Sequence, residues 1–327
     1  MYFVQVLLYQ EAMSLLSLIF ALLLEQIRPL SSGKYLNARL NGYVDFFQRN
    51  FNGGESKHGQ IAWLLAVSVP LFGSLSLYWI LAAQHPVFAW AFCVLVLYLT
   101  MGFRQFSHYF TDIHKALRNN DLKQARSLLS AWRAEPCDEL SSEEVIRVTI
   151  EEALLASHRN VFAVVVWFVI FMLLGLGPSG AIIYRLSRVL NSRWGQNKDP
   201  DTENFGKFAA QAYHWIEWLP MRLTASTFAI VGNFEDAIYC WRTQAAGWPD
   251  PQGGIVLASG AGALGVRLGM PVVQFGMGVD RPELGIGDEA DVDFMQSAVG
   301  LVWRALVFWL IMLLLLSLAS MASWVGV

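Results

Sequence analysis

Long apolar runs alternate with polar stretches along this chain, and several of the runs are long enough to form membrane helices. A helix needs about 20 apolar residues to cross the hydrocarbon core of a bilayer. The pattern predicts an all-α, polytopic integral membrane protein with four or five membrane segments. These segments cover residues 13–24, 61–82, 88–101, 161–190 and 302–325.

The fourth segment, 161–190, differs from a simple transmembrane helix. The sequence Gly175-Leu-Gly-Pro-Ser-Gly180 interrupts it, and glycine and proline end or kink helices. We therefore expect a broken or re-entrant helical hairpin here. Irregular backbone at membrane depth is tolerated only beside protein or a wet cavity. The break therefore indicates a nearby site.

Basic residues predict the orientation of the segments. Residues 25–60 carry five Lys/Arg and residues 102–160 carry eight, whereas the turn around Gln84 to Pro86 carries none. Loops rich in Lys/Arg stay in the cytoplasm, so the first two stretches are expected there. A hairpin at 161–190 also keeps the basic residues that follow it on the cytoplasmic side.

Two polar blocks, 102–160 and 191–301, are predicted to form amphipathic cytoplasmic helices. In the first block, Ser141-Ser-Glu-Glu144 has the form of an acidic helix start before an apolar run. In the second block, apolar and polar residues between positions 205 and 218 recur with the period of an amphipathic helix. We find no strand pattern and no internal repeat, so the whole chain, 1–327, is treated as one membrane domain.

Composition narrows the class of protein. Hydrophobic residues make up 55% of the chain and charged residues 15%, which is too apolar for an ordinary soluble domain. A net charge of -3 gives no electrostatic footprint for nucleic acid. The three cysteines are scattered, without the spacing of a metal or redox motif. The sequence therefore predicts a lipid membrane as partner, and neither nucleic acid nor a bound metal.

The segment from Gly260 to Pro271 carries the clearest candidate chemistry. It places Gly262, Gly265 and Gly269 around Arg267. Glycine permits close backbone approach, and arginine offers a fork of donors to phosphate or carboxylate. The segment is therefore a candidate anion-binding loop. The alternative is a small-residue helix packed tightly on a neighbour, with Arg267 as a surface charge.

Other polar residues are candidates for the same anion site. Arg159 and Arg188 flank the broken hairpin and are placed to clamp an anion, although arginines at helix ends also reach toward lipid headgroups. His214 and Glu217, three residues apart, form either an acid/base or ligand pair or the polar face of an interfacial helix. Arg222 follows Pro220 and is a candidate phosphate contact.

Several of these motifs resemble the CobD/CbiB family. The resemblance rests on Ile146 to Glu151, Gly177 to Arg185, Leu190 to Gly195, Gly262 to Gly269 and Asp280 to Gly287, followed by a last hydrophobic helix. Members of this family are membrane proteins that make adenosylcobinamide phosphate by joining an aminopropanol group to a corrinoid carboxylate. The resemblance implies a multi-pass protein of the bacterial inner (plasma) membrane.

The chain departs from the family pattern where carboxylates and amides are expected. Those positions hold Leu155, Ala156, Arg159, Asn160, Arg188, Asn191, Tyr213 and His214. Carboxylates and amides would hold Mg²⁺ and orient a phosphate. The polar set that replaces them is similar to that of the related AmpE family, which is linked to β-lactamase induction. The similarity covers Glu25, Arg159, Arg188 and the segment 214–223.

These observations favour an AmpE-like sensor or regulatory protein without ligase turnover. It would bind a small anion, either a corrinoid or a cell-wall-derived ligand, in a cytoplasm-facing cleft where Arg159, Arg188, Arg222 and Arg267 converge. The alternative is a divergent adenosylcobinamide-phosphate synthase, and only this alternative calls for a cofactor, Mg²⁺. A lipid or anion carrier is third, because no inverted repeat is visible. A monomer and a homo-oligomer are both compatible with the sequence.

Overall fold

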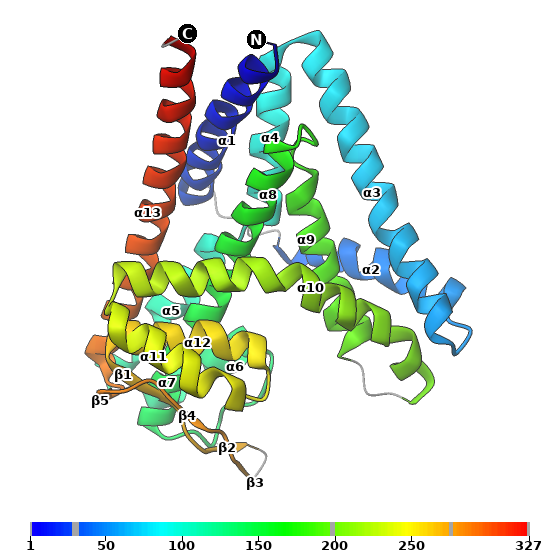
Figure 1. Cartoon of the computed structure of the whole chain (residues 1–327). Helices are drawn as coiled ribbons and strands as arrows, with labels where there is room; N and C mark the ends of the chain where they lie inside the picture. Colours follow the sequence, from blue (N-terminus) through cyan, green and yellow to red (C-terminus); the bar gives the residue numbers. More distant parts are fainter. Residues whose placement is uncertain (1, 28–32, 197–199, 275–276, 326–327) are drawn as a thin grey trace. The chain divides into compact units, whose positions relative to one another are not determined.

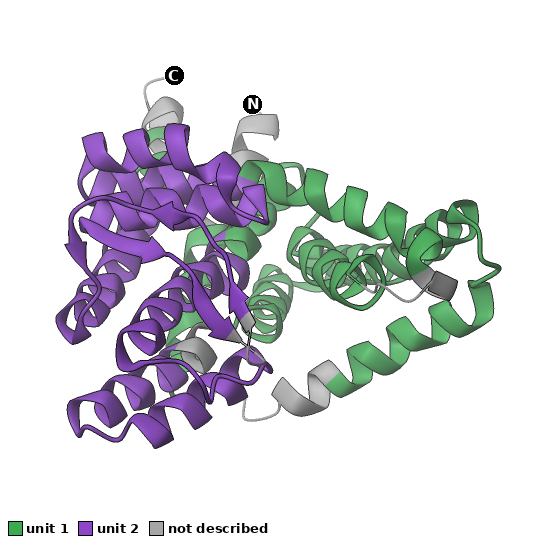
Figure 2. Ribbon diagram, turned by 90° about the horizontal axis from the view of Figure 1, so that it is seen from below, with its two compact units in different colours: residues 1–102, 163–219, 313–327 green, residues 103–162, 220–312 purple. Residues whose placement is uncertain are grey.

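The computed structural model of the chain describes residues 2–27, 33–196, 200–274 and 277–325 (Figure 1). Most of these residues are helical, which confirms the all-α class. They form two compact units, each assembled from segments distant in the sequence (Figure 2). Unit 1 contains residues 1–102, 163–219 and 313–327, and unit 2 contains residues 103–162 and 220–312. Of the predicted cytoplasmic block 102–160, residues 103–160 belong to unit 2, whereas the block 191–301 is divided between the units.

Unit 1 is a set of helices packed around a small apolar core. Trp194 and Phe205 meet edge to face in this core, with ring centroids 4.9 Å apart. At the surface, Nη2 of Arg193 lies 2.8 and 3.0 Å from the two carboxylate oxygens of Asp45. The unit comprises α1 (Tyr2–Ile27), α2 (Gly33–Phe51), α3 (Ser56–Gln84), α4 (Pro86–Thr100), α8 (Ala163–Leu173), α9 (Ser179–Leu190), the π-helical turn Asn191–Gly195, the first part of α10 (Pro200–Val231) and the end of α13 (Val292–Val325).

The predicted break in segment 161–190 coincides with a turn between two helices. Helix α8 ends at Leu173, and α9 begins at Ser179 and packs against α8 (Figure 1). Gly175 and Gly177 both have positive φ, and the ring of Tyr78 leaves no room for a side chain at Gly177. The break is therefore built from left-handed glycines. A re-entrant course through the membrane stays a prediction.

Within the described residues, three helices are long and apolar enough to cross a membrane: Ser56–Gln84, Ser142–Leu173 and Val292–Ala319. Two shorter apolar helices, Met13–Ile27 and Pro86–Thr100, match the first and third predicted segments. Large apolar side chains on α3 and α13 are exposed, with examples at Val69, Phe72, Leu315 and Leu318. Exposed apolar surface of this extent suits contact with lipid tails.

Unit 2 combines helices with several short strands. Helix α7 begins with the predicted acidic start, where Ser141 and Glu144 exchange hydrogen bonds in a capping box. The helical elements are α5 (Phe103–Arg118), α6 (Leu122–Arg133), α7 (Ser142–Ser157), the π-helical turn His158–Phe162, the end of α10, α11 (Phe234–Gln244), the 3-10 turn Ala245–Gly247, α12 (Pro251–Leu264) and the first part of α13 (Val292–Val325).

The strands of unit 2 differ from the sequence-based expectation, which included none. They are β1 (Val266–Gly269), β2 (Val272–Gln274), β3 (Met277–Val279), β4 (Glu283–Leu284) and β5 (Asp288–Glu289). Strand β1 lies between β4, which is antiparallel to it, and β5, which is parallel, while β2 and β3 form a separate antiparallel pair. Strands of two to four residues are too short to produce a readable alternation of apolar and polar positions.

Candidate functional site

A row of charged residues runs along one face of the otherwise largely buried helix α7. Glu143, Arg147 and Glu151 follow one another at intervals of four residues, a spacing that places side chains on one helix face. Helix α7 packs against α12 and β1. The charged row therefore lies on a helix that packs against the two elements containing the glycine-rich segment 260–271.

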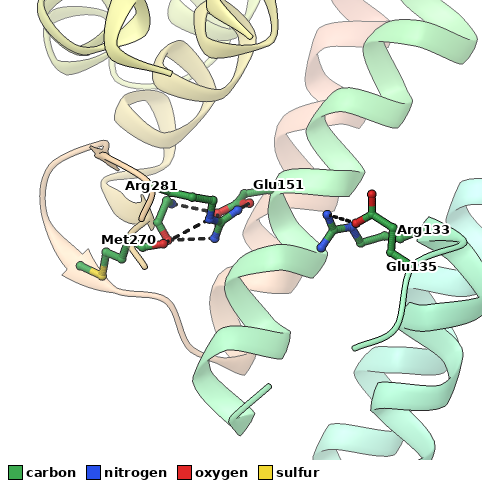
Figure 3. Close-up of polar contacts among 6 residues, drawn as sticks. Arg133, Glu135, Glu151, Met270 and Arg281 are labelled. Carbon is green, nitrogen blue, oxygen red and sulfur yellow. Dashed lines mark hydrogen bonds and ion pairs between the residues drawn. The ribbon is translucent and has the colours of Figure 1, made fainter. Parts of the chain in front are cut away.

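The inner end of this row forms a buried ion pair. Nη1 of Arg281 lies 2.7 Å from Oε2 of Glu151, and the two side chains are only 11% and 6% exposed. Oε1 of Glu151 also accepts a hydrogen bond from the backbone N–H of Gly269 at 2.8 Å. Figure 3 shows Glu151 on α7 and Arg281 on the strand-containing segment pointing toward each other. We call Glu151 and Arg281 the clamp.

The clamp fixes the backbone directly after β1. Arg281 donates to the carbonyl oxygens of Met270 and Gly269, each at 3.2 Å, and its guanidinium carbon lies 5.3 Å from the ring centre of Trp248. Gly269 and Met270 both have positive φ, which is uncommon for a methionine. The hydrogen bonds of the clamp compensate for this unfavourable backbone conformation.

The three predicted glycines have backbone and packing roles. Gly262 lies within α12, and a β-carbon there would meet the backbone of Asp236 on α11. Gly265 ends α12 in the left-handed conformation, with φ 67°, and Gly269 has φ 73° against the carbonyl of Pro282. The segment is not a loop but a tightly packed helix end followed by a strand, which agrees with the alternative of a small-residue helix for its first part. Anion binding stays a prediction that depends on Arg267.

Arg267 lies on β1 beside a small polar cavity. The side chain alternates away from the buried Val266 and Leu268, and 34% of it is exposed. It makes a 3.2 Å contact with Glu289 and a longer, 3.8 Å contact with Glu283. The cavity measures about 80 Å³ and is lined by Glu143, Arg147, Arg267, Met270, Glu289 and Ala290.

The two arginines of this cavity share a feature, a buried donor at the same atom of the side chain. The Nε atoms of Arg147 and Arg267 are buried, and neither has a hydrogen-bond partner among the described residues. Buried N–H groups nearly always have an acceptor, so each of these donors calls for one. The cavity can therefore take a group that carries several acceptor oxygens.

Two further predicted residues of unit 2 lie near a π-helical turn. Arg159 is within the turn His158–Phe162, where the helix is locally widened. The buried His158 lies 2.8 Å from the hydroxyl of Thr224, measured from Nδ1. Thr224 follows Arg222 by two residues on α10. The hydrogen bond thus joins the two elements that carry Arg159 and Arg222.

The remaining predicted residues belong to unit 1. Glu217 is buried and its Oε1 accepts a hydrogen bond from Tyr184 at 3.4 Å, while Arg188 lies in the last turn of α9, the helix that carries Tyr184. His214 is exposed, with its ring edge against Trp215. Glu217 and His214 therefore differ sharply in burial, and the proposed acid/base pair stays a prediction.

The predicted residues divide between the units. Arg188, His214 and Glu217 are in unit 1, and the others are in unit 2. Convergence of the four arginines in one cleft stays a prediction for this reason. Sequence reasoning did not single out Arg147, Glu151 and Arg281 as site residues. The spacing of Glu143, Arg147 and Glu151 was the available signal, because charges at four-residue intervals on an apolar helix need partners.

The side chains of unit 2 that could coordinate a metal ion bear on whether Mg²⁺ binds here. Mg²⁺ prefers several oxygen ligands in octahedral geometry. Among the residues that the structure describes, no three His, Cys, Asp or Glu side chains come together in a group that could hold a metal ion. Glu283 and Glu289 both face Arg267 instead. The described residues therefore form no site that would hold Mg²⁺ with protein ligands alone, and we assign no chemical step to the ion.

The chain was compared with known proteins. The model of the family described as "CobD/Cbib protein" matches residues 28–302. A cobalamin biosynthesis protein CobD from Stutzerimonas stutzeri is 35% identical over 303 residues, which cover 91% of this chain and 96% of that protein. The corresponding protein from Chromobacterium violaceum is 36% identical and covers 70% and 75% of the two chains.

A more distant relative, the cobalamin biosynthesis protein CbiB of Salmonella typhimurium, is 26% identical over 82% of this chain and 85% of its own length. No solved structure matches the chain. The similarity therefore extends over both compact units, including the charged face of α7 and the segment from α12 to β5.

Proposed function

Because this chain belongs to the CobD/CbiB family, we propose that it acts in cobalamin biosynthesis. The observation that carries the proposal is the 35% identity to a cobalamin biosynthesis protein, which extends over 91% of this chain and 96% of the relative. A match of this extent leaves no large part of either protein unaccounted for. It favours the biosynthetic alternative over the AmpE-like sensor that the polar substitutions suggested.

The proposed activity is that of an adenosylcobinamide-phosphate synthase. In this reaction the amine nitrogen of an aminopropanol phosphate forms an amide bond to the carbon of a corrinoid carboxylate, and the C–O bond that breaks releases one carboxylate oxygen, formally as water. Both the carboxylate and a phosphate on the amine substrate are oxyanions. Arginine recognises such groups through paired N–H donors. The cavity beside Arg147 and Arg267 supports this function, because it offers two guanidinium groups in a partly enclosed space.

This chain lacks several carboxylates that the family pattern places near the site. The structure makes their absence a weaker argument against the proposed activity than the sequence alone suggested. Ala156 is buried and Leu155 is half-buried on α7, where Cδ2 of Leu155 lies beside Gly253 of α12. Apolar residues at these positions contribute to the packing of α7 on α12. Their identity is therefore compatible with a rearranged substrate site that relies on arginines.

We further propose that the protein lies in the bacterial inner membrane with four or five crossings and a re-entrant hairpin at 161–190, and that unit 2 faces the cytoplasm. Eight Lys/Arg between residues 102 and 160 support the placement of unit 2. Alkaline phosphatase fused after Gln84 should be active, because the enzyme folds only outside the cytoplasm. The same fusion after Glu135 should be inactive, and the reverse pattern would contradict this topology.

Complementation tests the proposed activity. The gene is expressed in a strain that lacks its own CbiB-type ligase, and adenosylcobinamide phosphate is measured by mass spectrometry of cell extracts. We expect the product to be restored at ordinary expression. If the protein is present in the membrane fraction and no product forms, the biosynthetic proposal is wrong and the AmpE-like reading regains support.

A further inference from the structure

We propose that Arg147 and Arg267 form an oxyanion subsite, which binds a phosphate or carboxylate group, and that Glu289 releases Arg267 when the group enters. The subsite would be the cavity of about 80 Å³ in unit 2. The inference rests on the proposed function, in which the substrates carry such groups. It adds Arg147, which lies in the motif Ile146 to Glu151 but was not predicted to contact a ligand, and a carboxylate that competes with the ligand.

The positions of the two arginines follow from their secondary structure. Arg147 is the middle residue of the charged row on α7, and Arg267 is the outward-facing residue of β1. Because α7 packs against β1, the two guanidinium groups reach the same cavity from opposite elements. The clamp holds Gly269 and Met270 at the end of β1. It thereby stabilises one wall of the subsite.

The hydrogen bonds of the two arginines indicate an acceptor that the described residues do not supply. Both Nε–H groups are buried without an acceptor among the described residues. A buried donor without a partner is unfavourable, and hydrogen bonds between charged groups are among the strongest available to relieve it. A single phosphate or carboxylate can accept from both arginines at once.

Glu289 fits the role of a displaceable partner. Its side chain is 76% exposed and lies 3.2 Å from Nη2 of Arg267. An exposed ion pair of this kind contributes little stability, so exchanging it for a ligand costs little. Moving Glu289 into solvent also removes a negative charge from the cavity. Glu143 is exposed at the start of α7 and stays at the rim.

The test measures anion binding to the purified full-length protein in lipid nanodiscs at low ionic strength. Inorganic phosphate and acetate are titrated separately, so that the two arms distinguish phosphate from carboxylate recognition. The variants are Arg147→Gln, Arg267→Gln and Glu289→Gln. The matched control is Arg133→Gln, which removes the same charge from unit 2. Arg133 pairs with Glu135 at 2.7 Å (Figure 3) and also has a buried nitrogen, Nη1, without a partner among the described residues, but it does not line the cavity.

We expect Arg147→Gln and Arg267→Gln each to weaken binding of at least one anion by about tenfold or more, the scale of a lost charged hydrogen bond. Glu289→Gln should strengthen it about twofold to threefold, and Arg133→Gln should leave it unchanged. In parallel, the bound anion should protect Arg147 and Arg267, but not Arg133, from phenylglyoxal, as read by peptide mass spectrometry. This second measurement needs no variant and therefore does not depend on how the variants fold.

Wild-type protein that binds neither anion and shows no protection would overturn the subsite. Equal binding by wild type and both arginine variants would do the same. The complementation assay separates this inference from the proposed function. Arginine-dependent binding without complementation leaves the subsite standing and rejects the biosynthetic role. Full complementation by both arginine variants, with no protection, rejects the subsite alone.

Discussion

Arg267 and Arg281 lie on the same segment between α12 and α13, yet their surroundings differ in almost every respect. Arg281 is 11% exposed and donates to a buried carboxylate and to two backbone carbonyls. Arg267 is 34% exposed and lies 3.2 and 3.8 Å from the exposed carboxylates of Glu289 and Glu283. Its buried Nε–H has no acceptor among the described residues. The first arginine has its partners within the protein, and the second has donors left over.

The comparison shows how a structural arginine can be separated from a ligand-binding one. Residue type does not separate them, since both lie in motifs that resemble the family. The difference is whether the fold supplies acceptors for all the donors. A buried, fully bonded ion pair stabilises a specific backbone arrangement, whereas an under-bonded arginine beside a cavity is available to a ligand.

The largest expected effect comes from breaking the clamp. Glu151→Ala leaves Arg281 charged and buried without its carboxylate, and it removes the acceptor of the Gly269 N–H. Breaking one partner of a buried ion pair costs about 3–5 kcal/mol. The midpoint temperature of thermal unfolding of the purified protein in detergent should therefore fall. The control, Glu135→Ala, removes an exposed carboxylate paired with Arg133 and should cost less than about 1 kcal/mol.

Equal destabilisation by these two substitutions would contradict the distinction between a buried clamp and a surface pair. Figure 3 shows the two pairs in one view, with Glu151 and Glu135 on different elements of unit 2. Both variants remove one carboxylate from the same unit. Their difference therefore reports on burial rather than on charge.

The next effect concerns Arg267 and separates binding from stability. Arg267→Ala should weaken the binding of phosphate or acetate by about 1.5–3 kcal/mol, since it removes hydrogen bonds to a charged group. Its effect on thermal unfolding should be less than about 1 kcal/mol, because the ion pairs it loses are exposed. Arg267→Lys should recover part of the affinity, because lysine keeps the charge but loses the planar fork. A large loss of stability with unchanged affinity would make Arg267 a structural residue like Arg281.

A smaller loss of folding stability is expected when both partners of the clamp are replaced together. The double variant Glu151→Leu with Arg281→Met removes both buried charges and keeps apolar volume. It should be more stable than Glu151→Ala, with a remaining cost of about 1–3 kcal/mol from the unsatisfied Gly269 N–H. Thermal unfolding of the three proteins gives the order. If the double variant is the least stable, the clamp contributes more than a compensated pair of charges.

The sequence predicted the helical class and the position of the break between α8 and α9. Both follow from local features: long apolar runs, and glycines beside a proline. It did not predict β1 to β5, because strands of two to four residues are too short to show an alternation of apolar and polar positions. It also did not distinguish Arg267 from Arg281. The clamp joins residues 130 positions apart, and a contact of this range depends on how α7 packs rather than on either local motif.

The prediction that four arginines converge in one cleft also depends on contacts between distant elements, which local sequence features do not specify. Arg159 and Arg222 are on elements that the bond between His158 and Thr224 joins, whereas Arg188 lies in the other unit. Helical periodicity places a residue on a face. It does not identify which distant element will cover that face.

The smallest expected effect on stability comes from Gly265, the turn residue between α12 and β1. Substitutions there test whether this turn determines the position of Arg267. Gly265 ends α12 with φ 67° and ψ 36°, and a β-carbon at this position would meet no atom within 4 Å. Gly265→Ala should therefore cost about 1 kcal/mol through backbone strain alone, and Gly265→Asn should cost less, because asparagine tolerates the left-handed conformation. Thermal unfolding measures both variants. Because the turn stays in place, the affinity of Gly265→Asn for phosphate should match wild type. A loss of affinity in this variant comparable to that of Arg267→Ala would indicate that the backbone at Gly265 contacts the anion itself.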